Sequence, residues 1–307
     1  MPTNVRQINA RINQHGLSNL LEAGVLATGG DVLITQNFTP IVRSVPTITF
    51  LHDLIFRRRP EFFSVGERAY FKLMELSLRR ATALCTSSIH EANYINEQLR
   101  LPRQAKAVGL AVPSSFAEAC AERPETVDNR PFLLSVGRLN RRKNIERLIE
   151  TVLSMTATDS AQDVVLYIVG ERDGLGLTLE HTQEALQKHV MFLGAVSPEN
   201  LKWLYENCAT FVFPSLDEGF GLPVVEALMC GAPIALSSIP AFGEFKSMIP
   251  ASHFFDPDDN HDMARAITEA VGSRTVPKAE YTLPQWGTVV SGIRSVAEEL
   301  NYKRRSV

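Results

Sequence analysis

Cysteine is scarce in this sequence, and the spacing of the few cysteines excludes two kinds of stabilising site. The 307 residues contain four of them, Cys85, Cys120, Cys208 and Cys230. No two are separated by the two-residue gap of a zinc-binding pair, and thiols so few and so far apart do not form the framework of a disulfide-rich protein. We therefore expect neither a zinc site nor a disulfide framework.

Long apolar runs and an excess of positive charge are also absent. No run approaches the roughly 18 residues that span a bilayer, and no basic and apolar leader opens the sequence. The net charge of −3 argues against a general nucleic-acid binder, and 45% hydrophobic with 21% charged residues is ordinary for a globular chain. We expect a cytoplasmic protein with no nucleic-acid partner, long enough for two domains.

Two common nucleotide-binding motifs are missing. A dinucleotide-dependent dehydrogenase carries Gly-x-Gly-x-x-Gly, but Gly219-Phe-Gly221 and Gly174-Leu-Gly176 both lack the third glycine. The phosphate loop of nucleotide hydrolases is absent as well. These two enzyme classes are therefore excluded as interpretations of the chain.

The segment from Phe211 to Glu226 is the most informative part of the sequence. Residues 210–213 form a β-branched and aromatic run, typical of a strand buried on both faces. Gly219 and Gly221 allow a sharp turn, Pro223 suits the first turn of a helix, and Gly231 suits its end. The unpaired amides of such a helix start favour an anion, above all a phosphate.

Two carboxylates flank this predicted anion site. Glu218 lies in the turn and Glu226 follows eight positions later, just past the first helical turn. Carboxylates only accept hydrogen bonds, which suits the vicinal hydroxyls of a sugar. The alternative is that Glu226 complements the helix dipole and that Glu218 is a solvated turn residue.

A second strand, turn and helix precede this segment. The strand candidate 132–136 leads into Gly137-Arg-Leu-Asn-Arg-Arg-Lys-Asn144, after which apolar residues follow at helical spacing. Arg138 and Lys143 could neutralise the two phosphates of a departing diphosphate. The alternative is a solvated basic loop, since Arg141 and Arg142 lie between them.

Strands and helices alternate through most of the chain. In the second half we expect further strands at 163–170, 190–194 and 233–236, and helices at 179–189, 198–207, from 222 and at 259–271. In the first half we expect strands at 31–35, 46–51, 81–86 and 105–109, and helices at 65–80 and 88–99. This order predicts parallel sheets covered on both faces, with ligands at the carboxyl ends of the strands.

The two glycine-containing segments together resemble motifs of the retaining glycosyltransferases of family four, over about residues 31–300 and most strongly over 131–240. The resemblance implies an α/β fold of the GT-B type, with two Rossmann-like domains facing across a cleft. It also implies that Arg138 and Lys143 bind the donor diphosphate, that Glu226 holds the ribose hydroxyls and that Glu218 lies beside the donor sugar. The remaining residues assigned to the donor site are Gly137, Gly219, Phe220, Gly221 and Leu222.

The resemblance also suggests the domain boundaries. We expect a shortened acceptor-side domain at 1–115, a linker at 116–130, a nucleotide-sugar domain at 131–280 and a C-terminal helix at 281–307 that packs back toward the first domain. Relatives open with a strand and a glycine-rich loop, whereas this chain opens with a polar helical stretch interrupted by His15-Gly16, and Gly29-Gly30 precedes a strand. The first domain therefore looks truncated, and an uncovered sheet edge invites an oligomer or a partner chain.

The first domain contributes one catalytic candidate and one candidate membrane contact. His52 follows the predicted strand 46–51, where relatives place a histidine facing the donor sugar; the alternative is a loop histidine paired with Asp53. The stretch 56–63 interleaves aromatic and arginine side chains, a pattern that suits peripheral contact with anionic lipid. The plainer interpretation, which we favour, is an aromatic core with a solvated basic face.

We expect a hexosyltransferase that retains the anomeric configuration and uses no metal or other cofactor, with Glu218, His52, Arg138 and Lys143 as its catalytic residues. The donor is a nucleoside diphosphate sugar, with GDP-mannose favoured over a UDP-sugar, and the acceptor is a hydroxyl of a glycan or a lipid-linked glycan. The alternative is a catalytically weak nucleotide-sugar-binding subunit that needs a partner chain.

Overall fold

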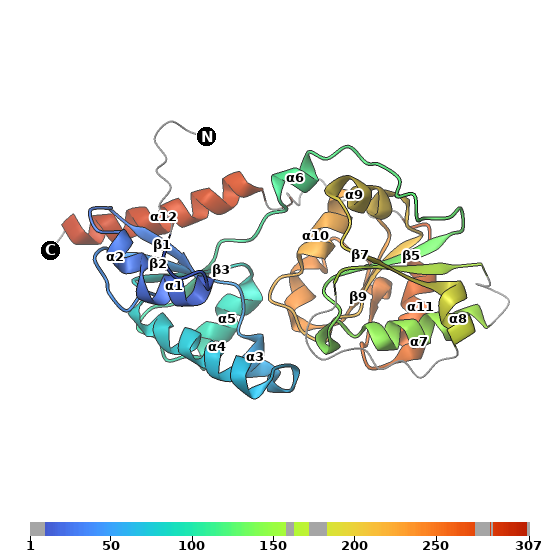
Figure 1. The fold of residues 1–307 in the computed structure, drawn as a ribbon, viewed down its shortest axis with the longest axis horizontal. Helices are drawn as coiled ribbons and strands as arrows, with labels where there is room; N and C mark the ends of the chain where they lie inside the picture. Colours follow the sequence, from blue (N-terminus) through green and yellow to red (C-terminus); the bar gives the residue numbers. More distant parts are fainter. Residues whose placement is uncertain (1–9, 158–162, 172–182, 274–282, 284, 306–307) are drawn as a thin grey trace. The chain divides into compact units, whose positions relative to one another are not determined.

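The chain forms two compact units, each with a parallel sheet and covering helices (Figure 1). The computed structural model describes residues 10–157, 163–171, 183–273, 283 and 285–305. Unit 1 comprises Met1–Leu110 and Trp286–Val307, and unit 2 comprises Ala111–Gln285. The predicted α/β class is therefore confirmed.

Unit 2 contains a six-stranded sheet in the order β10-β9-β8-β5-β6-β7, and all of its strand pairs are parallel. The strands are β5 (Phe132–Val136), β6 (Val165–Val169), β7 (Val190–Gly194), β8 (Thr210–Phe213), β9 (Ile234–Ser237) and β10 (Phe254–Phe255). The sheet grows from β5 toward β7 and then returns to the other side of β5 with β8. Such a reversal of strand order marks the place where open α/β sheets bind ligands, at the carboxyl ends of the strands.

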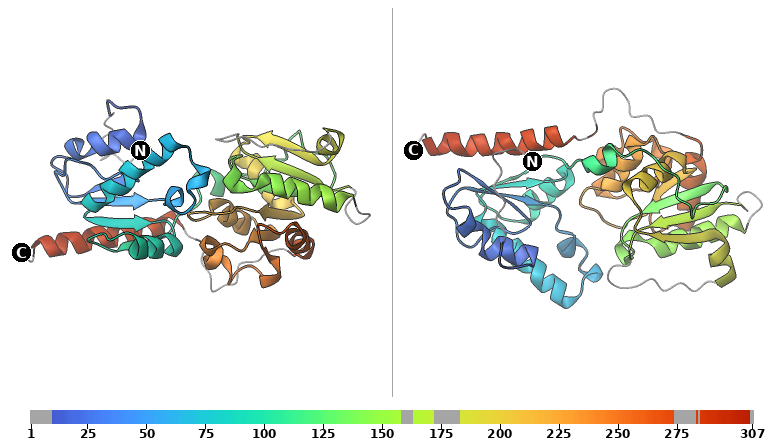
Figure 2. Two further views of the ribbon diagram at one scale, coloured as in Figure 1. Left: turned by 90° about the horizontal axis from the view of Figure 1, so that it is seen from below. Right: turned by 45° about the horizontal axis from the view of Figure 1, so that its top comes forward.

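Helices cover both faces of this sheet (Figure 2). The helices of unit 2 are α6 (Ser114–Ala117), α7 (Ile145–Thr156), α8 (Gln183–His189), α9 (Pro198–Asn207), α10 (Leu222–Met229) and α11 (Asn260–Ala270), with the 3-10 helices η3 (Arg141–Lys143), η4 (Pro240–Phe245) and η5 (Ala251–His253). On one face α7 and α11 share a buried cluster with Leu133 and Val212. On the other, Trp203 and Tyr205 of α9 contact the rings of Phe132 and Phe211. Successive residues of β5 and β8 therefore point to opposite apolar layers, which explains why these strands are mostly apolar in the sequence.

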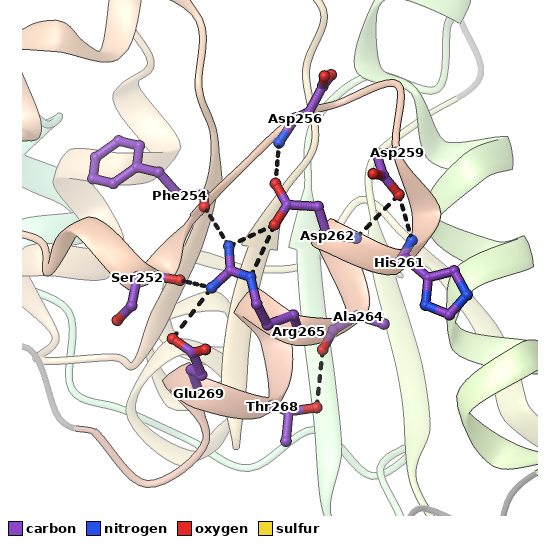
Figure 3. A network of polar contacts seen from close by, with 10 residues as sticks. All are labelled: Ser252, Phe254, Asp256, Asp259, His261, Asp262, Ala264, Arg265, Thr268 and Glu269. Carbon is purple, nitrogen blue, oxygen red and sulfur yellow. Dashed lines mark hydrogen bonds and ion pairs between the residues drawn. The ribbon is translucent and has the colours of Figure 1, made fainter.

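A polar network fastens the short edge strand β10 to α11 (Figure 3). Arg265 donates hydrogen bonds to the backbone oxygens of Ser252 and Phe254, at 2.6 and 3.0 Å, and to the carboxylate of Asp262 at 2.7 Å. Asp262 in turn accepts a bond from the backbone N–H of Asp256, just after β10. Side chains thus hold in place an edge strand that is too short to be fixed by its ladder alone.

Unit 1 contains a four-stranded parallel sheet in the order β1-β2-β3-β4. Its strands are β1 (Leu33–Gln36), β2 (Thr47–Leu51), β3 (Ala83–Thr86) and β4 (Ala105–Ala107). Its helices are α1 (His15–Leu21), α2 (Ala23–Leu26), α3 (Ile55–Arg58), α4 (Val65–Ser77), α5 (Ile89–Gln98) and α12 (Trp286–Arg305), with the 3-10 helices η1 (Pro60–Phe62) and η2 (Leu78–Arg80). One sheet face packs on α4 and α5, and the other packs Ile48, Phe50 and Cys85 against Val296 of α12.

Most of the predicted elements are present, with ends that differ by a few residues. The strands predicted at 132–136, 190–194 and 210–213 have these bounds, and the helix predicted at 65–80 is α4 continued by η2. The predicted helix 179–189 is confirmed from 183 onward, and its predicted start lies outside the described residues. The short elements α6 and β10 were not predicted, because one helical turn or two strand residues carry no periodicity.

The predicted interruption of the first helical stretch at His15-Gly16 is wrong. His15 begins α1, and Gly16 lies buried in its first turn. A Cβ atom at Gly16 would lie 1.9 Å from the Tyr70 hydroxyl oxygen and 2.6 Å from the Phe38 ring. This glycine therefore allows α1 to pack closely on α4, and it does not break the helix.

The aromatic and basic stretch 56–63 is largely built into unit 1. Phe56 is buried, and Phe63, Tyr70 and Phe71 pack against the same core cluster. Arg57 contacts Glu75 at 2.9 Å, Arg58 pairs with buried Glu91, and Arg59 lies 3.3 Å from Glu61. The favoured interpretation thus holds for Phe56 and Phe63, whereas Phe62 is half-exposed beside Arg59. The arginines of the stretch are paired with carboxylates instead of being only solvated.

Candidate functional site

The two segments singled out in the sequence meet at the carboxyl edge of the unit 2 sheet. β5 and β8 are adjacent and parallel, with Leu133 and Leu134 opposite Thr210 and Phe211. The turn after β8 donates a backbone hydrogen bond from Leu216 to the Arg142 oxygen, at 2.9 Å. The turns that follow the two strands are therefore in direct contact.

A buried carboxylate and two cations form the centre of this contact. Lys143 Nζ lies 2.5 Å from Glu218 Oε1, and Arg142 Nη1 lies 2.7 Å from Glu218 Oε2. The side chains of Lys143 and Glu218 are only 10% and 9% exposed. The interpretation of Glu218 as a solvated turn residue is thus wrong, and so is that of Lys143 as part of a solvated loop.

The charge state of Glu218 follows from its two partners. Burial alone would raise the pKa of this carboxyl group, but the attraction of Lys143 and Arg142 outweighs burial and lowers the pKa to about 2. Glu218 is therefore ionised at neutral pH. It can accept hydrogen bonds or stabilise positive charge, but it does not serve as a general acid there.

The turn after β5 is shaped to hold the Lys143 side chain. Gly137 has φ +150°, and a Cβ atom there would lie 3.1 Å from Lys143 Cε, so the lysine stem lies along this glycine. Lys143 Nζ also lies 4.5 Å from the centre of the Phe213 ring, at the end of β8. Arg138, in the same turn, is exposed at the carboxyl edge of the sheet.

The helix start predicted after β8 is confirmed. Gly221 caps α10 with φ +98°, Pro223 lies in the first turn, and Gly231 follows the helix with φ +66°. A Cβ atom at Gly221 would lie 2.9 Å from Phe242 Cε1, so the position requires glycine for space as well as for conformation. Phe220 is buried beside Phe245, whereas Leu222 is half-buried.

Glu226 lies on α10 and is held by a buried tyrosine. The Tyr205 hydroxyl donates a hydrogen bond to Glu226 Oε2 at 3.0 Å. Burial raises the pKa of Glu226, and the bond from Tyr205 opposes that effect. Sequence reasoning identified Glu226 but not this partner.

His52 belongs to unit 1, directly after β2. Its Nε2 atom bonds the side-chain amide of Gln36, its backbone N–H donates to Asn37 Oδ1 at 3.2 Å, and its ring packs edge-on against Phe50. Burial lowers the pKa of His52, and the charge of Asp53 partly offsets this effect. The imidazole is therefore a neutral group held at a strand end.

The described residues contain neither a metal-binding cluster nor a membrane-spanning helix. Among residues 10–157, 163–171, 183–273, 283 and 285–305, no group of three or more His, Cys, Asp or Glu side chains could hold a metal ion. In the same part of the chain, no helix combines the length and apolarity that a membrane crossing requires.

Known proteins resemble this chain in sequence and in structure. Residues 118–281 match the family model described as "Glycosyl transferases group 1". The serotype-specific mannosyltransferase WbdA of Escherichia coli is 29% identical over 239 residues, which are 73% of this chain and 29% of WbdA. The O-antigen chain mannosyltransferase B of Escherichia coli is 35% identical over 237 residues, or 73% of this chain and 61% of that protein. The chain thus spans less than two thirds of either relative.

A solved structure shows the likeness of the fold. Sucrose-phosphate synthase from Thermosynechococcus elongatus superposes with a TM-score of 0.62 over 90% of this chain and 75% of its own, at 18% identity. The GT-B type of fold expected from the motif resemblance is confirmed by such neighbours.

Proposed function

Because the chain belongs to the glycosyl transferases group 1 family, we propose that it transfers a hexose from a nucleoside diphosphate sugar to a hydroxyl of a glycan or lipid-linked acceptor, with retention of the anomeric configuration. Mannose is the favoured sugar and GDP-mannose the favoured donor, with a UDP-sugar as the alternative. The relatives named above are mannosyltransferases, which supports this choice of sugar.

The observation that carries the proposal is the buried contact of Glu218 with Lys143 and Arg142. It joins the turn assigned to the diphosphate with the turn assigned to the donor sugar. An ammonium carries three N–H donors, so Lys143 can contact Glu218 and a phosphate oxygen at once. Glu218 thus holds Lys143 in place before the donor binds. We propose that the bound donor then places its sugar and its diphosphate on either side of the Lys143 ammonium.

The proposed division of roles follows from the chemistry of each group. Arg138 and Lys143 neutralise the diphosphate as it departs, together with the backbone amides at Phe220 and Gly221. Fixed groups of this kind need no reorganisation during the reaction, and we propose that they act in place of a metal ion. Gly137, Gly219 and Leu222 line the same site, and Glu226 binds the ribose hydroxyls.

The reaction at the sugar is proposed from the family resemblance. The acceptor hydroxyl attacks from the face of the leaving group, and a diphosphate oxygen takes its proton. Glu218, which stays ionised at neutral pH, accepts hydrogen bonds from sugar hydroxyls and stabilises positive charge that develops on the ring. His52, in unit 1, is proposed to bond a hydroxyl of the sugar or of the acceptor.

A turnover assay tests the proposal. Release of GDP from GDP-mannose, and of UDP from UDP-sugars, is measured with purified protein and a panel of glycan and lipid-linked acceptors. We expect Glu218→Ala and Lys143→Ala to reduce turnover by about 100-fold or more. Arg141→Ala, which changes an exposed arginine of the same turn, is the matched control and should retain activity.

Donor binding without turnover on any acceptor would contradict the enzyme and favour the alternative of a binding subunit that needs a partner chain. Absence of nucleotide binding would contradict both.

A further inference from the structure

Tyr205 is a buried polar residue of unit 2 that the proposed reaction does not yet use. It lies on α9, its side chain is 0% exposed, and its ring packs edge-on against Phe211 and Phe116, at 5.2 and 6.0 Å between centroids. These ring contacts explain why an aromatic residue is present, but not why it carries a hydroxyl. A buried phenol hydroxyl is costly unless it has a partner.

The partner of the hydroxyl is Glu226, 21 positions further along the chain. The Tyr205 hydroxyl donates to Glu226 Oε2 at 3.0 Å. Burial raises the pKa of Tyr205 well above its usual value, and the neighbouring Glu226 carboxylate adds to this effect. The phenol therefore stays protonated at neutral pH and can donate this hydrogen bond.

Glu226 benefits from this bond in two ways. Burial disfavours the charged carboxylate, and a donated hydrogen bond offsets part of that cost, so the group remains an acceptor. The bond also fixes one carboxylate oxygen, and with it the orientation of the other, Oε1. An acceptor held in one orientation binds a hydroxyl with less loss of side-chain entropy.

We propose that Tyr205 is a positioning residue for the donor nucleotide, whose hydroxyl orients Glu226 so that Oε1 accepts a hydrogen bond from a ribose hydroxyl. This inference rests on the proposed function, because it takes the diphosphate sugar site as given. It adds that the preference for ribose over dideoxyribose depends on Tyr205, a residue outside both motifs.

The test compares ligands with and without ribose hydroxyls. Affinities of GDP and of 2′,3′-dideoxyguanosine diphosphate, with the uridine pair in parallel, are measured by calorimetry for the wild type and for Tyr205→Phe. Phenylalanine retains the ring contacts and loses only the hydroxyl. We expect Tyr205→Phe to weaken binding of the ribonucleotide by about three- to tenfold and to leave the dideoxynucleotide unchanged.

Tyr167 provides a matched control in the same unit. It is also 0% exposed, packs its ring against Phe132 at 5.1 Å, and accepts one hydrogen bond at its hydroxyl, from the Asp128 backbone N–H. Tyr167→Phe removes a comparable buried hydroxyl without affecting Glu226. It should bind all ligands as the wild type does, and thermal unfolding of both variants checks that they are folded.

A second variant, Glu226→Ala, tests directly whether the Glu226 carboxylate recognises the ribose. Glu226→Ala should abolish the preference for ribose, and Tyr205→Phe should then have no further effect on it.

The outcomes separate the two proposals. If the wild type binds neither GDP nor UDP, the proposed function fails and this inference with it. If it binds a diphosphate but does not prefer ribose, or if Tyr205→Phe weakens both ligands equally, the inference is overturned while the diphosphate site stands.

Discussion

The acid sensitivity of unit 2 should depend on Glu218. The pKa of this group is lowered from 4.5 to about 2 by Lys143 and Arg142, against the effect of burial. A tenfold change in an acid constant corresponds to about 1.4 kcal/mol, so the ionised Glu218 contributes about 3 kcal/mol to the free energy of unfolding at neutral pH. The Glu218 side chain is only 9% exposed, so solvent screening reduces this figure little.

The direction in which folding changes the pKa of Glu218 decides how its contribution to the free energy of unfolding varies with pH. Because the folded pKa is the lower one, the stabilisation is fully present above about pH 5 and is lost as the pH falls toward 2. Between pH 6 and pH 3 the contribution should fall by about 2 kcal/mol. Glu218→Gln has no carboxyl group at this position and should not show this loss.

Urea unfolding of the wild type and of Glu218→Gln from pH 6 to pH 3 measures the effect. We expect the wild type to be the more stable protein at pH 6 and the difference to narrow by about 2 kcal/mol at pH 3. A difference that stays constant or widens as the pH falls would refute the assignment of Glu218 as a buried ion-paired carboxylate.

Two further predictions concern the turns. Gly170→Ala should destabilise unit 2 by about 2 kcal/mol or more in urea unfolding, because at φ +140° its Cβ atom would lie 2.0 Å from the Gly137 oxygen. Gly243→Ala, whose Cβ atom would meet nothing within 4 Å, is the control, and equal losses would contradict this reasoning. In an NMR titration the His52 imidazole should titrate below pH 6.5, because burial lowers its pKa; a midpoint above 6.5 would show that it is not desolvated.

The sequence predicts the central strands of the unit 2 sheet well because they are buried on both faces. β5 and β8 are mostly apolar runs with proline or glycine next to them, so their positions are clear without tertiary information. The meeting of the two turns follows from the alternation of strands and helices, since parallel strands end at one edge.

The side-chain contacts of the site cannot be predicted from the sequence. Lys143 and Glu218 are 75 positions apart, and nothing in their spacing shows that they touch. The sequence places Arg142 next to Lys143 in a basic turn, but it does not show that Arg142 is the second partner of Glu218. The sequence predicts the helix that contains Tyr205, but it cannot identify Glu226 as the partner of the Tyr205 hydroxyl. Each of these facts depends on tertiary packing.

We propose that a diphosphate binds where the turn after β5 meets the start of α10. Calorimetry with GDP and GMP, and with UDP and UMP, on the wild type, Arg138→Ala and the control Arg141→Ala tests it most directly. For the matching base we expect the diphosphate to bind at least about tenfold more tightly than the monophosphate, with most of this difference lost in Arg138→Ala and kept in Arg141→Ala. Equal binding of monophosphate and diphosphate by the wild type, or an unchanged difference in Arg138→Ala, would contradict the claim.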